Sequence, residues 1–248
     1  MNIDIKSDWW KEFFEGPESD VVLTTDAEDT VRFIKHIGEI NNGMRVYDQC
    51  CGKGQLAFAL ASEGLEVTGI DFSEEFISFA KSNYNSKNLN FDIGNVSEKI
   101  FQEPFDIIIN WNTSFAYSED DEENEKMICS VGANLKKGGQ FFFSTMNPLY
   151  ISKNFQKFIV KEVPFNYSSI ITIRESWIEN NMMKSKWTII YPDGERKYKY
   201  GQTKLYSLEE MNRMFLKYGL TIQETYGDTY FNPYDANHSR MILYGRKL

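Results

Sequence analysis

The stretch from Met44 to Asp71 constrains the fold more than any other part of the chain. A short apolar run ends at Asp48, a turn containing Gly52 and Gly54 follows, and a helical segment leads into a second apolar run that ends at Asp71. This order predicts a strand, a glycine loop, a helix and a second strand, with an acid at the tip of each strand. Such a unit is typical of proteins that hold an adenosine-bearing cofactor.

The remaining pattern predicts an α/β fold built on a Rossmann-like, doubly wound, seven-stranded sheet whose final strand is antiparallel. A continuous apolar run such as F-D-I-I-I-N is expected of a strand buried on both faces. The expected strands are 44–48, 66–71, 89–93, 105–110, 140–145, 220–226 and 240–246, and the expected helices include 54–63, 74–82, 119–135 and 207–217.

Residues 148–204 interrupt this alternation with runs of period two. Three such runs are separated by Asn180–Asn181 and by a turn at 192–194, which predicts an antiparallel strand insertion. We expect this insertion to contribute to a substrate or dimer region. Trp177 and Trp187 lie on adjacent strands of it, where contact with substrate, contact with a second subunit and core packing are open alternatives.

Residues 1–42 are predicted to form a helical cap on a single domain that spans 1–248. Ser7 is expected to begin an aromatic helix, D-W-W-K-E-F-F, which ends at Gly16 and Pro17. A second helix is expected to start around Thr25–Asp26. The apolar stripe of the first helix predicts either packing on the domain or a lid over a ligand.

Composition narrows the class of function. The formal net charge is −9 and the pI is about 4.9, so the surface repels phosphate backbones and a nucleic-acid partner is disfavoured. Three cysteines without framework spacing indicate a reducing, cytoplasmic setting, and two distant histidines predict no metal site. No apolar run is long enough to span a membrane, so no membrane partner is expected.

The glycine loop fits two kinds of cofactor. Gly52-x-Gly54-x-x-Ala57 matches the dinucleotide pattern, with Asp71 seventeen residues after Gly54. However, Asp48 precedes Gly52 by four residues and would face the charges of a pyrophosphate at an electrostatic cost. No second nucleotide-binding half follows. A cationic, phosphate-free adenosine ligand, S-adenosylmethionine, fits better.

Over roughly residues 30–248, the chain resembles the class I S-adenosylmethionine-dependent methyltransferases. The resemblance lies in V-Y-D-Q-C-C-G-K-G, V-T-G-I-D-F-S-E-E-F, D-I-G-N-V, F-D-I-I-I-N and L-K-K-G-G-Q-F-F-F-S-T, in this order. Among them it is similar to small-molecule N- and O-methyltransferases that carry an antiparallel insertion. It implies methyl transfer to a nitrogen or oxygen of a small acceptor, aromatic, heterocyclic or sugar, with S-adenosylhomocysteine as product.

The resemblance also implies which residues bind the cofactor. The Asp48 carboxylate and the Cys50 carbonyl should receive the ammonium group, and Asp71 should accept both ribose hydroxyls. The other implied residues are Gly52 and Gly54 beside the cofactor, Phe72 on the adenine, Asn95 and Val96 at the adenine edge, and Asn110 and Trp111 along the methionine moiety. Cys50 and Asn95 replace the usual Gly and Asp; a side chain at position 50 is expected to require a negative φ.

The acceptor is expected between the segment after the fourth strand, the insertion, the final loop and the N-terminal helix. We expect Trp10, Phe115, Tyr230 and Arg240 to contact it, although Arg240 could instead tether the loop. His238 and Tyr117 are candidate bases, with a solvated loop histidine as the alternative for His238. A homodimer is a further expectation. A tRNA methyltransferase and a cofactor-binding protein without turnover are the alternative functions.

Overall fold

The computed structural model describes residues 5–16, 26–165 and 167–248, so the expectations for Pro17 and Thr25 lie outside the described residues. The chain divides into two compact units. The small unit comprises 1–24, 116–119 and 154–205, and the large unit comprises 25–115, 120–153 and 206–248.

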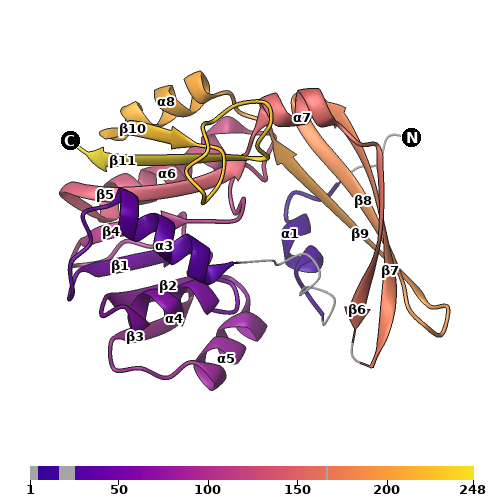
Figure 1. Ribbon diagram of the computed structural model, residues 1–248, viewed down its shortest axis with the longest axis horizontal. Helices are drawn as coiled ribbons and strands as arrows, with labels where there is room; N and C mark the ends of the chain where they lie inside the picture. Colours follow the sequence, from indigo (N-terminus) through magenta and orange to yellow (C-terminus); the bar gives the residue numbers. More distant parts are fainter. Residues whose placement is uncertain (1–4, 17–25, 166) are drawn as a thin grey trace. The chain divides into compact units, whose positions relative to one another are not determined.

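The large unit contains a seven-stranded sheet in the order β10-β11-β5-β4-β1-β2-β3 (Figure 1). β11 runs antiparallel to both β10 and β5, and the other strand pairs of this sheet are parallel, as predicted. The strands are β1 (Arg45–Gln49), β2 (Glu66–Asp71), β3 (Leu89–Ile93), β4 (Phe105–Asn110), β5 (Leu135–Met146), β10 (Leu220–Tyr226) and β11 (Arg240–Lys247). The helices are α3 (Ala27–Ile37), α4 (Gln55–Ser62), α5 (Glu74–Asn83), α6 (Asp121–Asn134), α7 (Pro148–Asn154) and α8 (Leu208–Lys217).

Three consecutive phenylalanines of β5 show how helices cover both faces of this sheet. Side chains alternate between the faces along a strand. Phe141 and Phe143 pack against Phe215 of α8, whereas Phe142 belongs to the core cluster that includes Phe33 of α3 and residues of α4. The sheet is therefore buried on both sides, which is why its strands read as continuous apolar runs.

Helix caps fix where several helices of the large unit begin. The Ser73 hydroxyl accepts from the Phe76 amide at 3.2 Å, and Ser207 forms a capping box with Glu210, both at positions that the sequence predicts. The acidic segment before α6 also starts a helix, with Asp120 as its N-cap. The prediction for Ser7 was wrong by one residue, since Asp8 occupies the N-cap position of α1.

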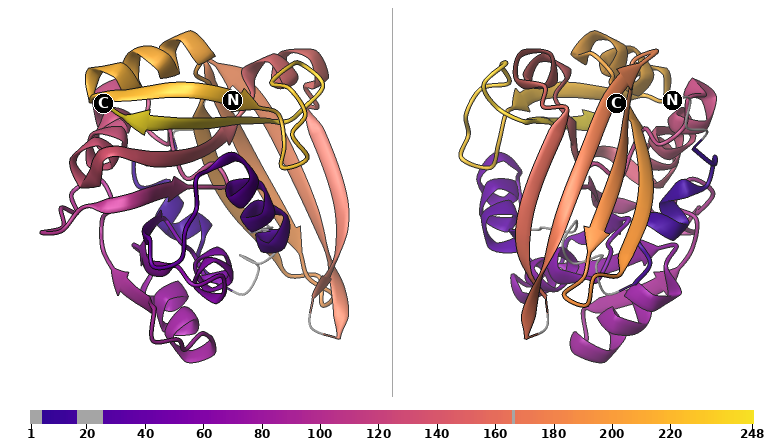
Figure 2. Two further views of the ribbon diagram at one scale, coloured as in Figure 1. Left: turned by 60° about the vertical axis from the view of Figure 1, so that its left-hand side comes forward. Right: turned by 90° about the vertical axis from the view of Figure 1, so that its right-hand side faces the viewer.

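The small unit contains a four-stranded antiparallel sheet in the order β6-β7-β8-β9 (Figure 2, salmon to orange). The strands are β6 (Phe158–Phe165), β7 (Ser168–Glu179), β8 (Met182–Ile190) and β9 (Arg196–Lys204), and the helix is α1 (Trp9–Phe13). Asn180 and Asn181 have φ of 51° and 61°, the backbone of a tight hairpin turn. The predicted antiparallel insertion is therefore confirmed.

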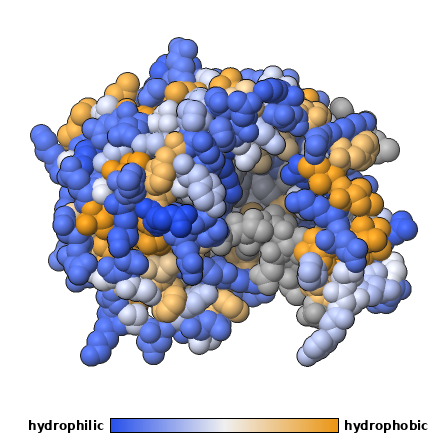
Figure 3. Space-filling view, viewed as in Figure 1, coloured by the Kyte–Doolittle hydropathy of each residue, from blue (hydrophilic) through white to orange (hydrophobic). Residues whose placement is uncertain are grey.

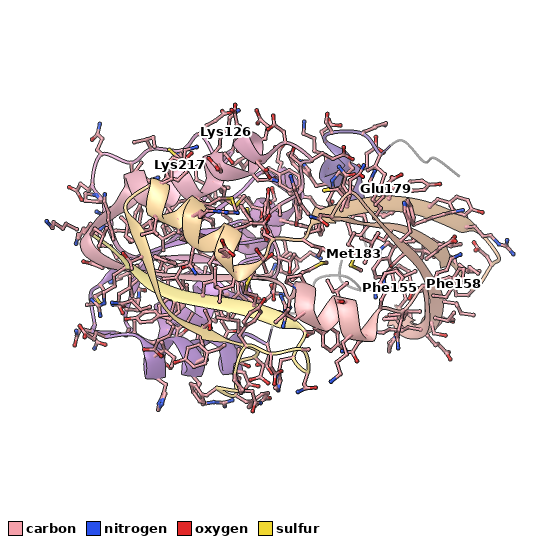
Figure 4. The ribbon with its side chains drawn as sticks, turned by 90° about the horizontal axis from the view of Figure 1, so that it is seen from above. Lys126, Phe155, Phe158, Glu179, Met183 and Lys217 are labelled. Atoms are coloured by element: carbon pink, nitrogen blue, oxygen red, sulfur yellow. The ribbon has the colours of Figure 1, made fainter. Side chains whose placement is uncertain are left out.

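The two faces of this sheet differ, and they are called the Trp187 face and the Phe158 face. On the Trp187 face, Trp9 and Phe13 of α1 pack over Gly201, where an added Cβ would lie 3.0 Å from Trp9. The Phe158 face exposes Phe158, Val160 and Ile171, and apolar atoms gather over this sheet in Figure 3. By its register, Met183 lies on the Trp187 face. Figure 4 labels Met183 and Phe158, one residue from each face.

Three elements differ from the sequence prediction. Residues 148–154 form α7 rather than the start of the insertion, and β6 was not predicted. β6 is an edge strand that contains Pro164, and proline is tolerated in a sheet only at such an edge. β5 begins at Leu135 because Leu135 already pairs with Phe105 of β4, so the predicted helix ends one residue earlier.

No helix within the described parts of the chain is long and apolar enough to cross a membrane.

Candidate active site

Asp48 is a buried carboxyl group near the end of β1. Its register places it beside Gly69 of β2 and Ile109 of β4, and it is 2% exposed. The Oδ2 atom has no hydrogen-bond partner among the described residues. Burial, with a smaller contribution from Asp71, raises the pKa of Asp48 to about 8. A buried carboxyl without a partner is suited to a cationic ligand, which would favour its ionised form.

Asn110 supplies a second acceptor at the neighbouring strand end. It pairs with Gln49 in the register of β4 with β1, and its side chain is fully buried. Its Nδ2 donates to the Met127 sulfur at 3.0 Å, whereas its Oδ1 has no donor within the described chain. Buried acceptors normally find donors, so Asn110 and Asp48 together fit a ligand that brings several N–H groups.

Asp71 ends β2 and is held by the backbone around it. Its Oδ2 accepts from the Gly52 amide at 2.9 Å and its Oδ1 from the Ser73 amide at 3.0 Å. These bonds favour the ionised form, yet burial still raises the pKa of Asp71. Each oxygen keeps a second lone pair, so the carboxylate can accept two hydroxyl groups of a ribose while the glycine loop fixes its position.

The loop between β1 and α4 has three residues with left-handed backbone. Gly54 has φ of 83°, and a Cβ there would lie 2.6 Å from Phe91, so only glycine fits. Gly52 has φ of 54° and nothing within 4 Å of an added Cβ, which leaves open space beside its backbone. Cys50 has φ of 58°, so the expected negative φ was wrong: the chain keeps the left-handed turn and strains a cysteine there.

The other residues predicted to bind the cofactor have mixed surroundings. Val96 is buried and Phe72 is partly exposed at the end of β2. The Asn95 side chain is exposed; its amide donates to Glu98 at 2.8 Å and its oxygen accepts from the Ser97 amide at 3.1 Å. Trp111 packs with Phe33 in the core cluster. Their contacts to adenine and methionine stay predictions.

His238 lies in the loop before β11, and Arg240 is the first residue of β11. The His238 Nδ1 is 2.8 Å from Asp235 Oδ1, and its Nε2 is 4.0 Å from Asp228 Oδ2. Arg240 donates to Asn112 Oδ1 at 3.1 Å and to Thr113 Oγ1 at 3.4 Å. Arg240 therefore tethers the segment after β4, one of its two predicted roles, and its contact with an anionic group stays a prediction.

Of four further residues predicted to line the acceptor site or act as a base, two belong to the small unit and two to the large unit. In the small unit, Tyr117 packs against Trp9 with ring centroids 4.8 Å apart, and Trp10 is partly exposed on α1. In the large unit, Phe115 is 1% exposed and packs against Phe143. Tyr230 is 63% exposed and donates to Asp29 at 2.5 Å. Phe115 thus has a packing role here, and Tyr230 anchors the final loop to α3.

The segment after β4 has a strained backbone that the sequence did not predict. Asn112, Thr113 and Ala116 have φ of 57°, 63° and 70°, and such strain concentrates at functional sites. The sequence signal was weak, because only asparagine among these three residues favours a left-handed backbone. Within the described residues, no cluster of three His, Cys, Asp or Glu side chains could hold a metal ion.

Comparison with known proteins identifies the family of the chain. A family profile described as a methyltransferase domain matches residues 40–212. A ubiquinone biosynthesis O-methyltransferase from Coxiella burnetii is 30% identical over 167 residues, which are 66% of this chain and 65% of that protein. The chain thus spans about 65% of the length of this relative. It belongs to the methyltransferase domain family.

Solved structures show the same fold. The CcbJ methyltransferase from Streptomyces caelestis has a TM-score of 0.79 at 16% identity and covers 96% of this chain and 95% of its own. SAM-bound CalS10, an amino pentose methyltransferase from Micromonospora echinaspora, has a TM-score of 0.68 at 14% identity. The match covers 100% of this chain and 99% of CalS10. With the family established, the cofactor is S-adenosylmethionine, as predicted, and the unpartnered acceptors at the ends of β1 and β4 fit its ammonium group.

Proposed function

We propose that the chain transfers a methyl group from S-adenosylmethionine to a nitrogen or oxygen of a small acceptor. The observation that carries this proposal is Asp48, whose buried oxygen has no partner and whose pKa burial raises. Asp48 and Asn110 would receive the cofactor's ammonium group, and Asp71 its ribose hydroxyls. The open space at Gly52 leaves room for the cofactor beside the backbone.

When bound, S-adenosylmethionine supplies an electrophilic methyl group on a positively charged sulfur. The chain then has to position an acceptor in line with that methyl group and keep water away. Arg240 contributes by fixing the strained segment after β4 through Asn112 and Thr113. This segment follows directly on Asn110, so the contacts of Arg240 also stabilise the wall of the cofactor site.

His238 is the residue we propose as base for acceptors that lose a proton. Asp235 accepts at Nδ1 if that nitrogen carries the proton, which fixes the ring and leaves Nε2 as the basic nitrogen. Tyr117 stays a weaker candidate. His238→Gln should lower kcat by about 100-fold for a phenol or carboxylic acceptor and leave the affinity for S-adenosylmethionine unchanged.

Three observations support a small acceptor. The relative from Coxiella burnetii is named for O-methylation in ubiquinone biosynthesis, and CalS10 is described as an amino pentose methyltransferase. The net charge of −9 opposes binding to nucleic acid. Together they do not choose between nitrogen and oxygen as the methylated atom.

The test combines binding and transfer. Calorimetry should show S-adenosylmethionine binding that Asp48→Asn weakens by about 10- to 100-fold, the scale of a charged hydrogen bond. Asp106→Asn is the matched control, because Asp106 lies on the adjacent strand and pairs with Lys136. Labelled methyl transfer to a panel of amines, phenols and N-heterocycles then tests turnover. Tight binding with no transfer to any acceptor would favour a protein that binds the cofactor without catalysis.

A further inference from the structure

His238 lies in a short backbone turn of the loop between β10 and β11, together with Asp235. The His238 amide donates to the Asp235 carbonyl oxygen at 3.5 Å, and the His238 Nδ1 is 2.8 Å from Asp235 Oδ1. Hydrogen bonds from the Asn237 amide and then from the His238 ring lower the pKa of Asp235, so its carboxylate is ionised at neutral pH. The pair thus has the arrangement of a carboxylate that orients a histidine.

Asn147 joins this turn to the large sheet. It lies between β5 and α7 and is fully buried. Its Nδ2 donates to two carbonyl oxygens, those of Asp235 and His238, each at 2.7 Å. Its backbone amide donates to the Ser239 carbonyl at 3.2 Å. One side chain therefore holds both ends of the turn that carries the carboxylate and the imidazole.

The orientation of the Asn147 amide group follows from its partners on the other side. Its Oδ1 accepts from the Leu149 amide at 2.9 Å and from the Tyr150 amide at 3.4 Å, at the start of α7. With the amide group turned over, the oxygen would face two carbonyl oxygens and the nitrogen would face two N–H groups. Such an arrangement would leave four buried polar groups unsatisfied, so the contacts to the turn require an asparagine with this orientation.

Gly227 is a second, independent constraint on the His238 ring. It follows β10, and its amide donates to the Asn232 carbonyl at 2.8 Å. A Cβ added at Gly227 would lie 2.4 Å from the Cβ and 2.7 Å from the Cγ of His238. The histidine therefore lies directly against the Gly227 backbone, where any side chain would collide with it. The ring is confined between this backbone and Asp235, while 24% of the side chain stays exposed.

We propose that Asn147 is a positioning residue that holds the Asp235–His238 pair in the geometry for proton transfer. All of these residues belong to the large unit. The inference rests on the proposed role of His238 as base and names the residue that fixes this base. With Nδ1 donating to Asp235, Nε2 keeps its lone pair and can take a proton from the acceptor.

The proton balance of the step is simple. The acceptor's electron pair forms the bond to the methyl carbon, the bond from that carbon to the cofactor sulfur breaks, and the acceptor's proton goes to Nε2. Asp228 Oδ2 lies 4.0 Å from Nε2, so the imidazolium that results has a carboxylate near each nitrogen. Asn147 contributes by keeping the Asp235 carboxylate on the Nδ1 side throughout.

The first test reads the state of the His238 ring and needs no turnover. The chain has two histidines, so NMR of the imidazole nitrogens in the full chain, with His36→Gln for assignment, identifies the His238 signals. The neutral ring should carry its proton on Nδ1. Asn147→Ser keeps an oxygen that can cap α7 but is too short to reach the two carbonyls, and should shift the ring to a mixture of both tautomers. Asn147→Asp removes the same donor without a change of shape and should act in the same way.

Asn134→Ser is the matched control for these variants. Asn134 is also buried, and its Nδ2 donates to the carbonyls of Lys99 and Ser130 at 2.8 and 2.9 Å. Its substitution should lower stability by a similar amount in thermal unfolding and leave the His238 signals unchanged. A proton on Nε2 in the unmodified chain, or unchanged signals in both Asn147 variants, overturns the proposal. So does an equal change of the signals in Asn134→Ser, because it would show a general loosening of the fold.

The second test uses turnover with a phenolic acceptor and separates this inference from the proposed function. Asn147→Ser should lower kcat about tenfold and leave the affinity for S-adenosylmethionine unchanged in calorimetry. In a chain that already carries His238→Gln, the same substitution should have no further effect, because the asparagine acts through the histidine. A further tenfold loss in that chain overturns the positioning role. If His238→Gln leaves kcat unchanged, or if no acceptor is methylated, the proposed base or the proposed function is wrong, while the NMR test still decides whether Asn147 holds the ring.

Discussion

The two units each contain a charged side chain with a buried atom that no described residue satisfies, and the two charges are opposite. In the large unit it is Asp48, near the end of a parallel strand. In the small unit it is Arg174, in the middle of an antiparallel strand, which is half-buried and has its guanidinium over the Trp187 ring. The first follows from a recognisable loop, whereas the second depends on which face of a strand is covered. The comparison teaches that a buried unsatisfied atom can occur with a sequence motif or without one.

The largest expected effect is the dependence of stability on pH, and it comes from Asp48. Its pKa is about 8 in the folded chain against an ordinary value of 3.8. Between these values the folded state holds a proton that the unfolded state lacks. The free energy of unfolding of the ligand-free chain should therefore fall as pH rises from 4 to 8, by up to about 1.4 kcal/mol per pH unit. The raised pKa of Asp71 acts in the same direction.

Urea unfolding between pH 5 and 8 measures this slope, with Asp48→Asn as the comparison. The variant should show a clearly flatter profile and higher stability at pH 8. Parallel profiles for the two proteins would mean that Asp48 is ionised in the folded chain. The comparison with Arg174 would then no longer hold for Asp48.

The matching change in the small unit is Arg174→Met, which replaces the half-buried charge with an apolar side chain of similar length. We expect it to raise the free energy of unfolding by up to about 1 kcal/mol, because Arg174 is only half-buried and solvent and the Trp187 ring already offset most of the cost of its charge. The exposed residue Arg196 gives the control: Arg196→Met should stay within about 0.5 kcal/mol. Thermal unfolding in the absence of ligand decides the matter, and a less stable Arg174→Met chain would show that the fold needs this charge.

Asp71 is the second buried acid. Unlike the Oδ2 atom of Asp48, both of its carboxylate oxygens already accept hydrogen bonds. Asp71→Asn should weaken S-adenosylmethionine binding by about 1.5–3 kcal/mol in calorimetry, because a charged acceptor for two hydroxyls is lost. It should also lower stability, since the Gly52 and Ser73 amides lose a carboxylate. An affinity equal to that of the unmodified chain would refute the ribose assignment.

Cys50→Gly is expected to have the smallest effect. The cysteine has φ of 58°, and glycine removes the strain of a left-handed side chain at some cost in unfolded-state entropy, for a net gain of about 0.5–1 kcal/mol. Chemical denaturation at fixed pH should resolve this difference. A loss of stability would indicate that packing of the cysteine side chain outweighs its backbone strain.

The sequence predicted the large unit well because its signals are local and periodic. The glycine loop, the apolar runs and the caps at Ser73 and Ser207 depend on neighbouring residues, so each element could be placed before the structure was known. The left-handed backbone at Cys50 could not be predicted, because the geometry of the loop overrides the preference of the residue. The edge strand β6 was missed because its mixed, proline-containing sequence is adapted to a single partner strand.

The polar residues of the two units differ in the same way. Asp48 and Asp71 were predicted from their place at the strand ends, and both are buried acids in the structure. Arg174 and Ser176 lie in a strand of alternating residues, and alternation does not reveal which of the two faces is covered. The lack of hydrogen-bond partners for Arg174 Nε and Ser176 Oγ is a property of three strands paired in one register, which a single sequence cannot show.

The small unit is assembled from three separate stretches of chain, and this has a consequence for synthesis in the cell. The Lys199 ammonium contacts the Phe13 carbonyl across a separation of 186 residues. At roughly 5–20 residues per second, the segment carrying Trp9 and Phe13 leaves the ribosome roughly 10–40 s before the strand that buries it. During that interval the aromatic segment has no sheet to pack on, so its Trp9 and Phe13 side chains stay exposed to water.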